Sequence, residues 1–181
     1  DNLTELQLNY FPHLSDHVLN DIIAAKCTNL QHLALGYCGE ESFTTEGLTL
    51  FFKEKWNPNI SDKLRFLSLD LTRNHQLKDD FLIVFLERYG YGIQNLNLNG
   101  LDLLTNESLM ILAKSCPNLI TLDVSWVRAV TDVFLIDLFN TSKNLESINI
   151  YGCNFLSEDV VNNDWINGNE RKIKIVGNEY I

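Results

Sequence analysis

The sequence lacks the features that mark membrane-spanning and polyanion-binding proteins. No apolar run reaches the roughly 18 to 20 residues needed to cross a bilayer, and residues 1 to 20 lack the basic and apolar segments of a signal peptide. Basic residues are few, with 14 Lys and Arg against 24 Asp and Glu, and the net charge is −10. Because phosphate neutralisation requires clustered Lys and Arg, this balance disfavours direct DNA binding. We therefore expect a soluble chain that binds neither a membrane nor, by itself, a nucleic acid.

Cysteine is also scarce. The four thiols are too few for a disulfide scaffold, and none shows the close pairing of a zinc site. They belong to Cys27, Cys38, Cys116 and Cys153. Four N-x-[ST] sequons would suit a secreted chain, but the abundance of Asn accounts for them by chance. We expect reduced thiols and an intracellular protein.

Sequence motifs of catalysis are missing as well. The chain contains no phosphate-binding loop, nucleophile elbow, dinucleotide-binding turn or H-E-x-x-H helix. His13 and His17 are the only His pair with metal-ligand spacing, and no third ligand beyond Asp16 accompanies them. Asp79 and Asp80 read as acidic residues at a helix start, where the helix dipole favours them. The sequence therefore predicts a protein that is not an enzyme and uses no cofactor, metal or small-molecule substrate.

What the sequence does contain is a repeat. The pattern L-x-x-L-x-L occurs six times, with first residues Leu3, Leu30, Leu64, Ile93, Leu119 and Leu145. Successive intervals are 27, 34, 29, 26 and 26 residues, which lies near the range of leucine-rich repeats. A seventh, partial strand follows at Ile173 and Ile175. The whole chain thus divides into repeats of one kind, with an insertion in the second.

Each repeat predicts a strand, a turn and a helix. The end of each pattern alternates with period two, and an apolar period near 3.6 follows after a short polar helix-start residue. The clearest helix starts are Ser15, Thr105, Thr131 and Ser157. We predict an α/β leucine-rich-repeat solenoid, a horseshoe with a parallel concave sheet and convex helices. It forms one domain over residues 1–181, with about six repeats and a terminal strand.

The chain begins inside a strand pattern, without the polar cap that a free solenoid end requires. We therefore expect it to be the C-terminal part of a longer protein. Any segment that recruits further subunits would then lie before Asp1.

Side chains that alternate with the core leucines should face the concave side, where solenoids bind their partners. Aromatic and Arg side chains make the strongest interface anchors, which singles out Trp126 and Arg128. The alternative is that Trp126 only packs on the adjacent turn, with Arg128 stacked over it. The candidate partner-binding residues, on the concave face and at the strand ends, are His32, Phe66, Ser68, Asp70, Asn97, Asp123, Ser125, Trp126, Arg128 and Tyr151.

The insertion in the second repeat falls in residues 53–62 and contains Trp56. Long loops in compact repeats are often functional. Trp56 either contacts a partner or anchors the loop to the body of the domain.

Residues Leu104 to Leu119 resemble the cysteine-containing leucine-rich repeats of F-box-type ubiquitin-ligase subunits. Cys27 and Cys116 each lie three residues before a first core Leu, and Cys38 and Cys153 each lie three residues after a last core residue. These two fixed phases indicate buried packing thiols.

A narrower resemblance lies in residues 122–130, 150–152 and 175–177. These segments resemble the leucine-rich-repeat subunits of the yeast ubiquitin ligase for global-genome nucleotide excision repair. The resemblance implies a nuclear protein that acts with a DNA-translocating ATPase of the Swi/Snf type, with elongin C and with a cullin, in repairing non-transcribed DNA. DNA would be reached through the ATPase partner.

Two other functions stay open on the sequence. A leucine-rich-repeat regulator of the cell cycle that targets proteins for degradation needs the same concave surface. Direct recognition of damaged DNA would need a basic surface despite the acidic total, and its candidate phosphate contacts are Arg73, Arg128, Arg171, Lys172 and Lys174.

Overall fold

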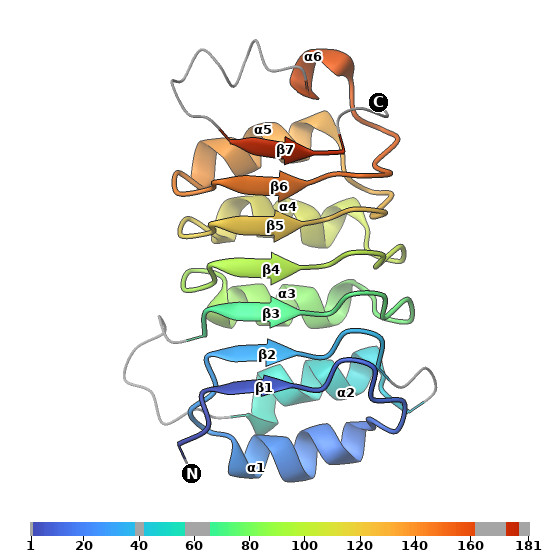
Figure 1. Ribbon diagram of the computed structural model, residues 1–181, viewed down its shortest axis with the longest axis vertical. Helices are drawn as coiled ribbons and strands as arrows, with labels where there is room; N and C mark the ends of the chain where they lie inside the picture. The colour runs from blue at the N-terminus through green and yellow to red at the C-terminus, as the bar shows by residue number, and fades with distance from the viewer. Residues whose placement is uncertain (1, 39–41, 57–65, 162–172, 178–181) are drawn as a thin grey trace.

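The computed structural model describes residues 2–38, 42–56, 66–161 and 173–177, which form an α/β leucine-rich-repeat solenoid, as predicted. Its strands are all parallel and stack in chain order from β1 to β7, with the helices on one face of the sheet (Figure 1). In the described part of the chain the opposite face carries no helix, and we call it the open face. The strands are β1 (Glu5–Gln7), β2 (His32–Ala34), β3 (Ser68–Asp70), β4 (Asn95–Asn97), β5 (Thr121–Asp123), β6 (Ser147–Asn149) and β7 (Lys174–Val176).

Some of the helical segments begin where a short polar side chain accepts a hydrogen bond from an amide of the first turn. Thr105 and Thr131 accept hydrogen bonds from the backbone amides of Glu107 and Phe134, which confirms two of the predicted helix starts. Two segments, labelled η, have wider π-type turns. In chain order the segments are η1 (Val18–Ile23), α1 (Ala24–Lys26), α2 (Thr45–Leu50), η2 (Phe51–Lys55), α3 (Asp79–Tyr89), α4 (Asn106–Ser115), α5 (Asp132–Thr141) and α6 (Glu158–Val161). None of the helices in the described ranges has the length and apolar character needed to span a bilayer.

The core lies between the sheet and the helices. The middle residue of each strand points toward the helices, and Leu33, Leu96 and Ile148 are at most 2% exposed. Both neighbours of such a residue in its strand are half-buried on the open face, so the period of two in the sequence becomes a division between core and surface. Every strand therefore contributes to one continuous apolar layer and to one polar surface.

The third repeat is in a different register from the one predicted. Leu33 pairs with Leu69, so Leu69 is the middle core residue and the repeat starts at Phe66, two residues after the predicted Leu64. Phe66 therefore occupies a core position and is 1% exposed, and its predicted place on the concave face is wrong. Residues that pair in neighbouring strands are 27, 36, 27, 26, 26 and 27 positions apart in the sequence, from β1 to β7. The whole insertion therefore lies between β2 and β3.

The insertion is joined to the core by Trp56, which is fully buried. Its indole Nε1 donates a hydrogen bond of 2.9 Å to the carbonyl oxygen of Cys27. Its ring packs among the aromatic side chains of Phe51, Phe52, Phe66 and Tyr89. Of the two interpretations of Trp56, anchoring of the segment to the domain is confirmed. The rest of the predicted insertion, residues 57–62, lies outside the described residues.

The equivalent position after β2, β3 and β6 joins neighbouring repeats through the hydrogen bonds of a buried Cys or Asn side chain. Asn74 donates from Nδ2 to the carbonyl of Leu35 at 2.8 Å and accepts at Oδ1 from the amide of Cys38 at 2.9 Å. Cys38 and Cys153 occupy this position in other repeats. Their thiols donate to the carbonyls of Leu8 and Val124, which lie in the preceding repeats and are equivalent to the Leu35 carbonyl. The repeats are thus tied by hydrogen bonds as well as by apolar packing.

All four thiols are free. Cys116 is completely buried, and desolvation raises its pKa to about 12. Desolvation is also the main reason that the pKa of Cys153 rises to about 12. A thiol that stays protonated at neutral pH is a poor nucleophile and a poor metal ligand. These two cysteines therefore act as packing residues, in line with their fixed phases.

Candidate functional site

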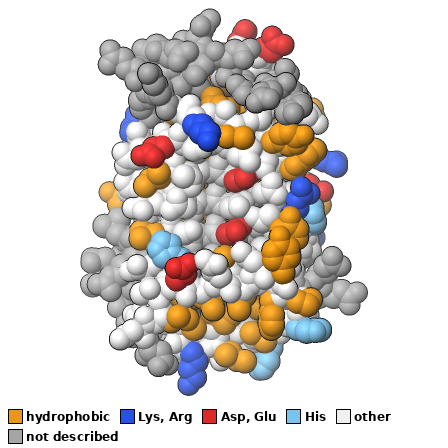
Figure 2. Space-filling view, in the orientation of Figure 1, with side chains coloured by type: hydrophobic (Ala, Val, Ile, Leu, Met, Phe, Trp, Pro, Cys, Tyr) orange, Lys and Arg blue, Asp and Glu red, His pale blue; other side chains and the backbone are white. Residues whose placement is uncertain are grey.

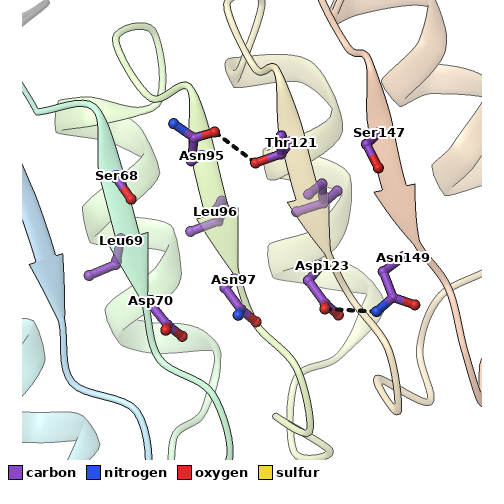
Figure 3. Close-up of a pocket in the computed structure, with 11 residues that line it drawn as sticks. Ser68, Leu69, Asp70, Asn95, Leu96, Asn97, Thr121, Asp123, Ser147 and Asn149 are labelled. Atoms are coloured by element: carbon purple, nitrogen blue, oxygen red, sulfur yellow. Dashed lines mark hydrogen bonds between the residues drawn. The ribbon is translucent and has the colours of Figure 1, made fainter. Parts of the chain in front are cut away.

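The open face holds a shallow polar groove across β3 to β6. Its volume is about 380 Å³. Figure 3 shows the residues that line it. It is lined by Ser68, Leu69, Asp70, Asn95, Leu96, Asn97, Thr121, Leu122, Asp123, Ser147 and Asn149. The polar members stand at alternate positions of neighbouring strands, so the strand register places them in rows. The groove therefore offers many hydrogen-bonding groups.

Hydrogen bonds between strands hold these side chains in place (Figure 3). Thr121 Oγ1 donates to Asn95 Oδ1 at 2.7 Å, and Asn149 Nδ2 donates to Asp123 Oδ2 at 2.8 Å. Asn95 and Asn99 both bond to side chains of the next repeat, so these two amides are fixed across the repeats. A surface with fixed polar groups loses less side-chain entropy when a partner binds.

Two carboxylates give the groove its charge. Asp70 Oδ1 accepts from the amide and the hydroxyl of Thr72, at 2.9 and 2.6 Å. Asp123 Oδ1 accepts in the same way from the amide and the hydroxyl of Ser125, at 2.9 and 2.5 Å. Figure 2 shows acidic side chains in the middle of the open face. The groove therefore favours a partner that donates hydrogen bonds.

Four of the predicted partner-binding residues lie together in this groove. They are Ser68, Asp70, Asn97 and Asp123. His32 lies beside Ser68 on the neighbouring strand and is half-buried. Ser125 is 1% exposed, so its predicted place on the surface is wrong: its hydroxyl is enclosed by the side chains of Asp123 and Asn99, which both bond to it.

The other predicted residues lie at the margin of the open face, where the strands end. Trp126 packs edge to face on Tyr151, with ring centroids 5.2 Å apart, so the predicted packing on the adjacent turn is observed. Trp126 is still 44% exposed after this packing. Arg128, which is exposed, lines the same hollow as Trp126. In Figure 2 hydrophobic side chains, with basic ones among them, follow the margin at the right. Trp126 is thus both packed and accessible.

Several surface residues were not among the candidates. Asn95, Thr121, Ser147 and Asn149 line the groove, and their alternation with the core residues was a sufficient signal for including them. Phe155 is 69% exposed at the margin. The sequence indicated Phe155 less clearly. The only sign was a large apolar residue at a position where the repeat pattern has no core residue.

The described residues contain no group of three His, Cys, Asp or Glu side chains that could hold a metal ion. His17 instead contacts Asp21, with Nδ1 2.7 Å from Oδ2. Both side chains are more than half exposed, so this pair contributes little to stability.

The parallel ladder, the helices on one side and the regular strand register define a leucine-rich-repeat protein. No protein-family model matches the chain. It is homologous to two proteins of known repair function. It is 33% identical over 153 residues to DNA repair protein rhp7 of Schizosaccharomyces pombe, and 34% identical over 163 residues to DNA repair protein RAD7 of Saccharomyces cerevisiae. These alignments cover 84% and 86% of this chain.

A solved structure agrees with the sequence comparison. A chain in the crystal structure of the Rad7 and Elc1 complex from yeast matches with a TM-score of 0.71 and 28% identity, over 92% of this chain and 38% of that one. The two curated relatives are much longer, and the alignments cover 26% of each. The homology thus extends over most of this chain and over about a quarter of the relatives.

Proposed function

We propose that this chain is the partner-binding solenoid of a ubiquitin ligase that acts in nucleotide excision repair of non-transcribed DNA in the nucleus. The observation that carries the proposal is its homology to two DNA repair proteins over more than four-fifths of its length. The structural relative was solved with Elc1, which supports elongin C as a partner of the whole protein. A cullin and a Swi/Snf-type ATPase complete the proposed assembly, and the ATPase supplies the contact with DNA.

The proposed mechanism is positioning without catalysis. The polar groove, with its side chains already fixed by hydrogen bonds, binds a segment of the partner protein. The stacked repeats share one continuous core, so the solenoid holds a protein bound there near the subunits that recruit the ubiquitin-conjugating enzyme. The chain then contributes to the reaction by raising the effective concentration of the substrate near the ubiquitin-conjugating enzyme.

Direct DNA binding is a weaker candidate. Of its proposed phosphate contacts, Arg171 and Lys172 lie outside the described residues. Arg73 and Arg128 line one hollow at the strand ends, whereas Lys174 lies on β7. The centre of the open face carries carboxylates, which repel phosphate. The cell-cycle alternative uses the same groove, and the repair homologues favour the repair reading over it.

The proposal is tested by affinity purification of the full-length protein from nuclear extract, with bound proteins identified by mass spectrometry. We expect a Swi/Snf-type ATPase, elongin C and a cullin. A Ser68→Arg/Asn97→Arg variant places two bulky charges in the groove and should lose at least one bound protein while it keeps elongin C.

The matched control is Ala25→Arg/Asn140→Arg, which makes the same change in charge at exposed positions on the helical side. It should recover the same proteins as the wild type. Recovery of cell-cycle substrates without a repair ATPase or elongin C would contradict the proposal.

A further inference from the structure

A second concave site lies at the margin of the open face, next to the groove. It is a hollow of about 450 Å³ formed by the turns that follow β3 to β6. Its lining includes Arg73, Asp102, Trp126, Arg128 and Phe155. We call it the margin hollow. It differs from the groove in chemistry, because it combines guanidinium groups with exposed aromatic rings.

The shape of the margin hollow depends on two glycines with left-handed backbone, Gly100 and Gly152, both at φ +74°. A Cβ atom on Gly152 would lie 2.6 Å from the ring of Trp126, and one on Gly100 would lie 2.8 Å from Cδ of Arg73. The absence of these side chains lets Arg73 and Trp126 lie over the next turn. Both residues are themselves held at positive φ, at 59° and 62°. The sequence thus keeps two large side chains at a strained backbone position on the rim of the hollow.

The charges in the margin hollow are not balanced within the described part of the chain. No carboxylate there pairs with Arg73 or Arg128. The one acidic residue of the lining, Asp102, contacts His75, with Oδ1 3.2 Å from Nδ1. Two guanidinium groups without a carboxylate partner stand out in a chain whose net charge is −10. They favour an anionic ligand.

The aromatic side chains add an apolar requirement. Trp126 is 44% exposed and Phe155 is 69% exposed, and both border the same hollow. Trp and Arg are the residues that most often dominate the energy of protein interfaces. A ligand that satisfies this hollow presents an apolar side chain to the rings and negative charges to the guanidinium groups.

We propose that the margin hollow binds an acidic segment of a partner protein, with one apolar side chain between Trp126 and Phe155 and flanking carboxylates on Arg73 and Arg128. The inference deepens the proposed function, because it assigns a partner chemistry to the strand-end margin of the same surface. A nucleic acid fits less well. Two Arg residues neutralise few phosphates, and the carboxylates of the neighbouring groove oppose the rest of a polyanion.

The test begins with a phage-displayed library of random peptides, selected on the immobilised full-length protein. We expect enriched peptides that carry an aliphatic or aromatic residue flanked by Asp or Glu. Their affinity is then measured by fluorescence anisotropy. Arg73→Gln/Arg128→Gln and Trp126→Ala should each weaken binding by about tenfold or more, because they remove charge-assisted hydrogen bonds or the apolar anchor.

The matched comparison uses two charge reversals. Arg73→Glu/Arg128→Glu should lose the acidic peptides, whereas Lys26→Glu/Lys114→Glu makes the same change in net charge at exposed positions on the helical side and should leave their affinity unchanged. Circular dichroism establishes that each variant is folded. Elongin C recovery from nuclear extract should be the same for all of them, so loss of the margin hollow is distinguishable from failure of the ligase assembly.

Three results would overturn the inference. The selection could enrich no acidic peptides. Enriched peptides could bind equally well to Arg73→Glu/Arg128→Glu. A fluorescein-labelled DNA duplex could bind in a manner that depends on Arg73 and Arg128 while acidic peptides do not, which would assign the hollow to phosphate.

Discussion

Replacing Trp56 with Ala is expected to lower the free energy of unfolding by about 3–5 kcal/mol, the usual cost of truncating a large buried aromatic side chain. Trp56 is fully buried, contacts several aromatic rings and donates to the Cys27 carbonyl. Its loss leaves a cavity between the second and third repeats and an unpaired acceptor. Urea unfolding followed by circular dichroism measures the change.

Trp126→Ala is the control for this prediction. It removes the same side chain from a position that is 44% exposed, so we expect a change within about 1 kcal/mol. Equal losses for the two variants would show that Trp56 does not have the structural role assigned to it. The comparison thus separates a Trp that holds the fold from one that is available to a partner.

The second large effect is expected for Asn74→Ala. The amide of Asn74 is completely buried and bonds to Leu35, Leu71 and Cys38. Its removal leaves the Cys38 amide and the Leu35 carbonyl without their partner in the interior. We expect a loss of about 2–4 kcal/mol in the free energy of unfolding, because each buried unpaired group costs about 1–3 kcal/mol.

Asn74→Cys tests the reason for that loss. Cys38 and Cys153 occupy the equivalent position in other repeats and donate to the equivalent carbonyls. A thiol at position 74 should therefore recover part of the stability that Ala loses, since it restores the donor but not the acceptor. Asn144→Ala, at an exposed position, should stay within about 0.5 kcal/mol of the wild type. If Cys were as destabilising as Ala, the hydrogen bond to Leu35 would not be the cause.

Much of the fold follows from the sequence because the solenoid repeats one local rule. Alternating apolar residues define each strand, and a polar cap such as Thr105 or Thr131 defines the start of the next helix. These signals act within one repeat, so each can be read without knowledge of the others. The parallel order of the strands then follows from stacking equal units.

The third repeat shows where local reading fails. Leu64, Leu67 and Leu69 fit the leucine pattern as well as Phe66, Leu69 and Leu71 do, and a shift of two residues keeps the alternation intact. What separates them lies outside the pattern. Phe66 completes the aromatic cluster around Trp56, and Asn74 reaches back to Leu35 only in the second register. Register was thus decided by contacts between repeats.

The candidate site was predictable to a similar degree. Alternation placed Ser68, Asp70, Asn97 and Asp123 on one face, and the strand register brings them together. It could not reveal that Ser125 is enclosed by its neighbours, because that depends on the side chain of Asn99 in the preceding repeat. Nor could it show the margin hollow, which exists because Gly100 and Gly152 leave room for Arg73 and Trp126. Contacts between turns are absent from any single-repeat pattern.

The proposed function requires that a protein partner binds the open face of the sheet. Site-specific photocrosslinking tests it most directly, with benzoylphenylalanine placed either at Asn97 in the groove or at Lys114 on the exposed side of α4, in the full-length protein in nuclear extract. We predict that the groove position crosslinks to a protein of the repair ligase or to its ubiquitylated substrate, and that the helix position does not. Crosslinks to those proteins from Lys114 alone would contradict the account.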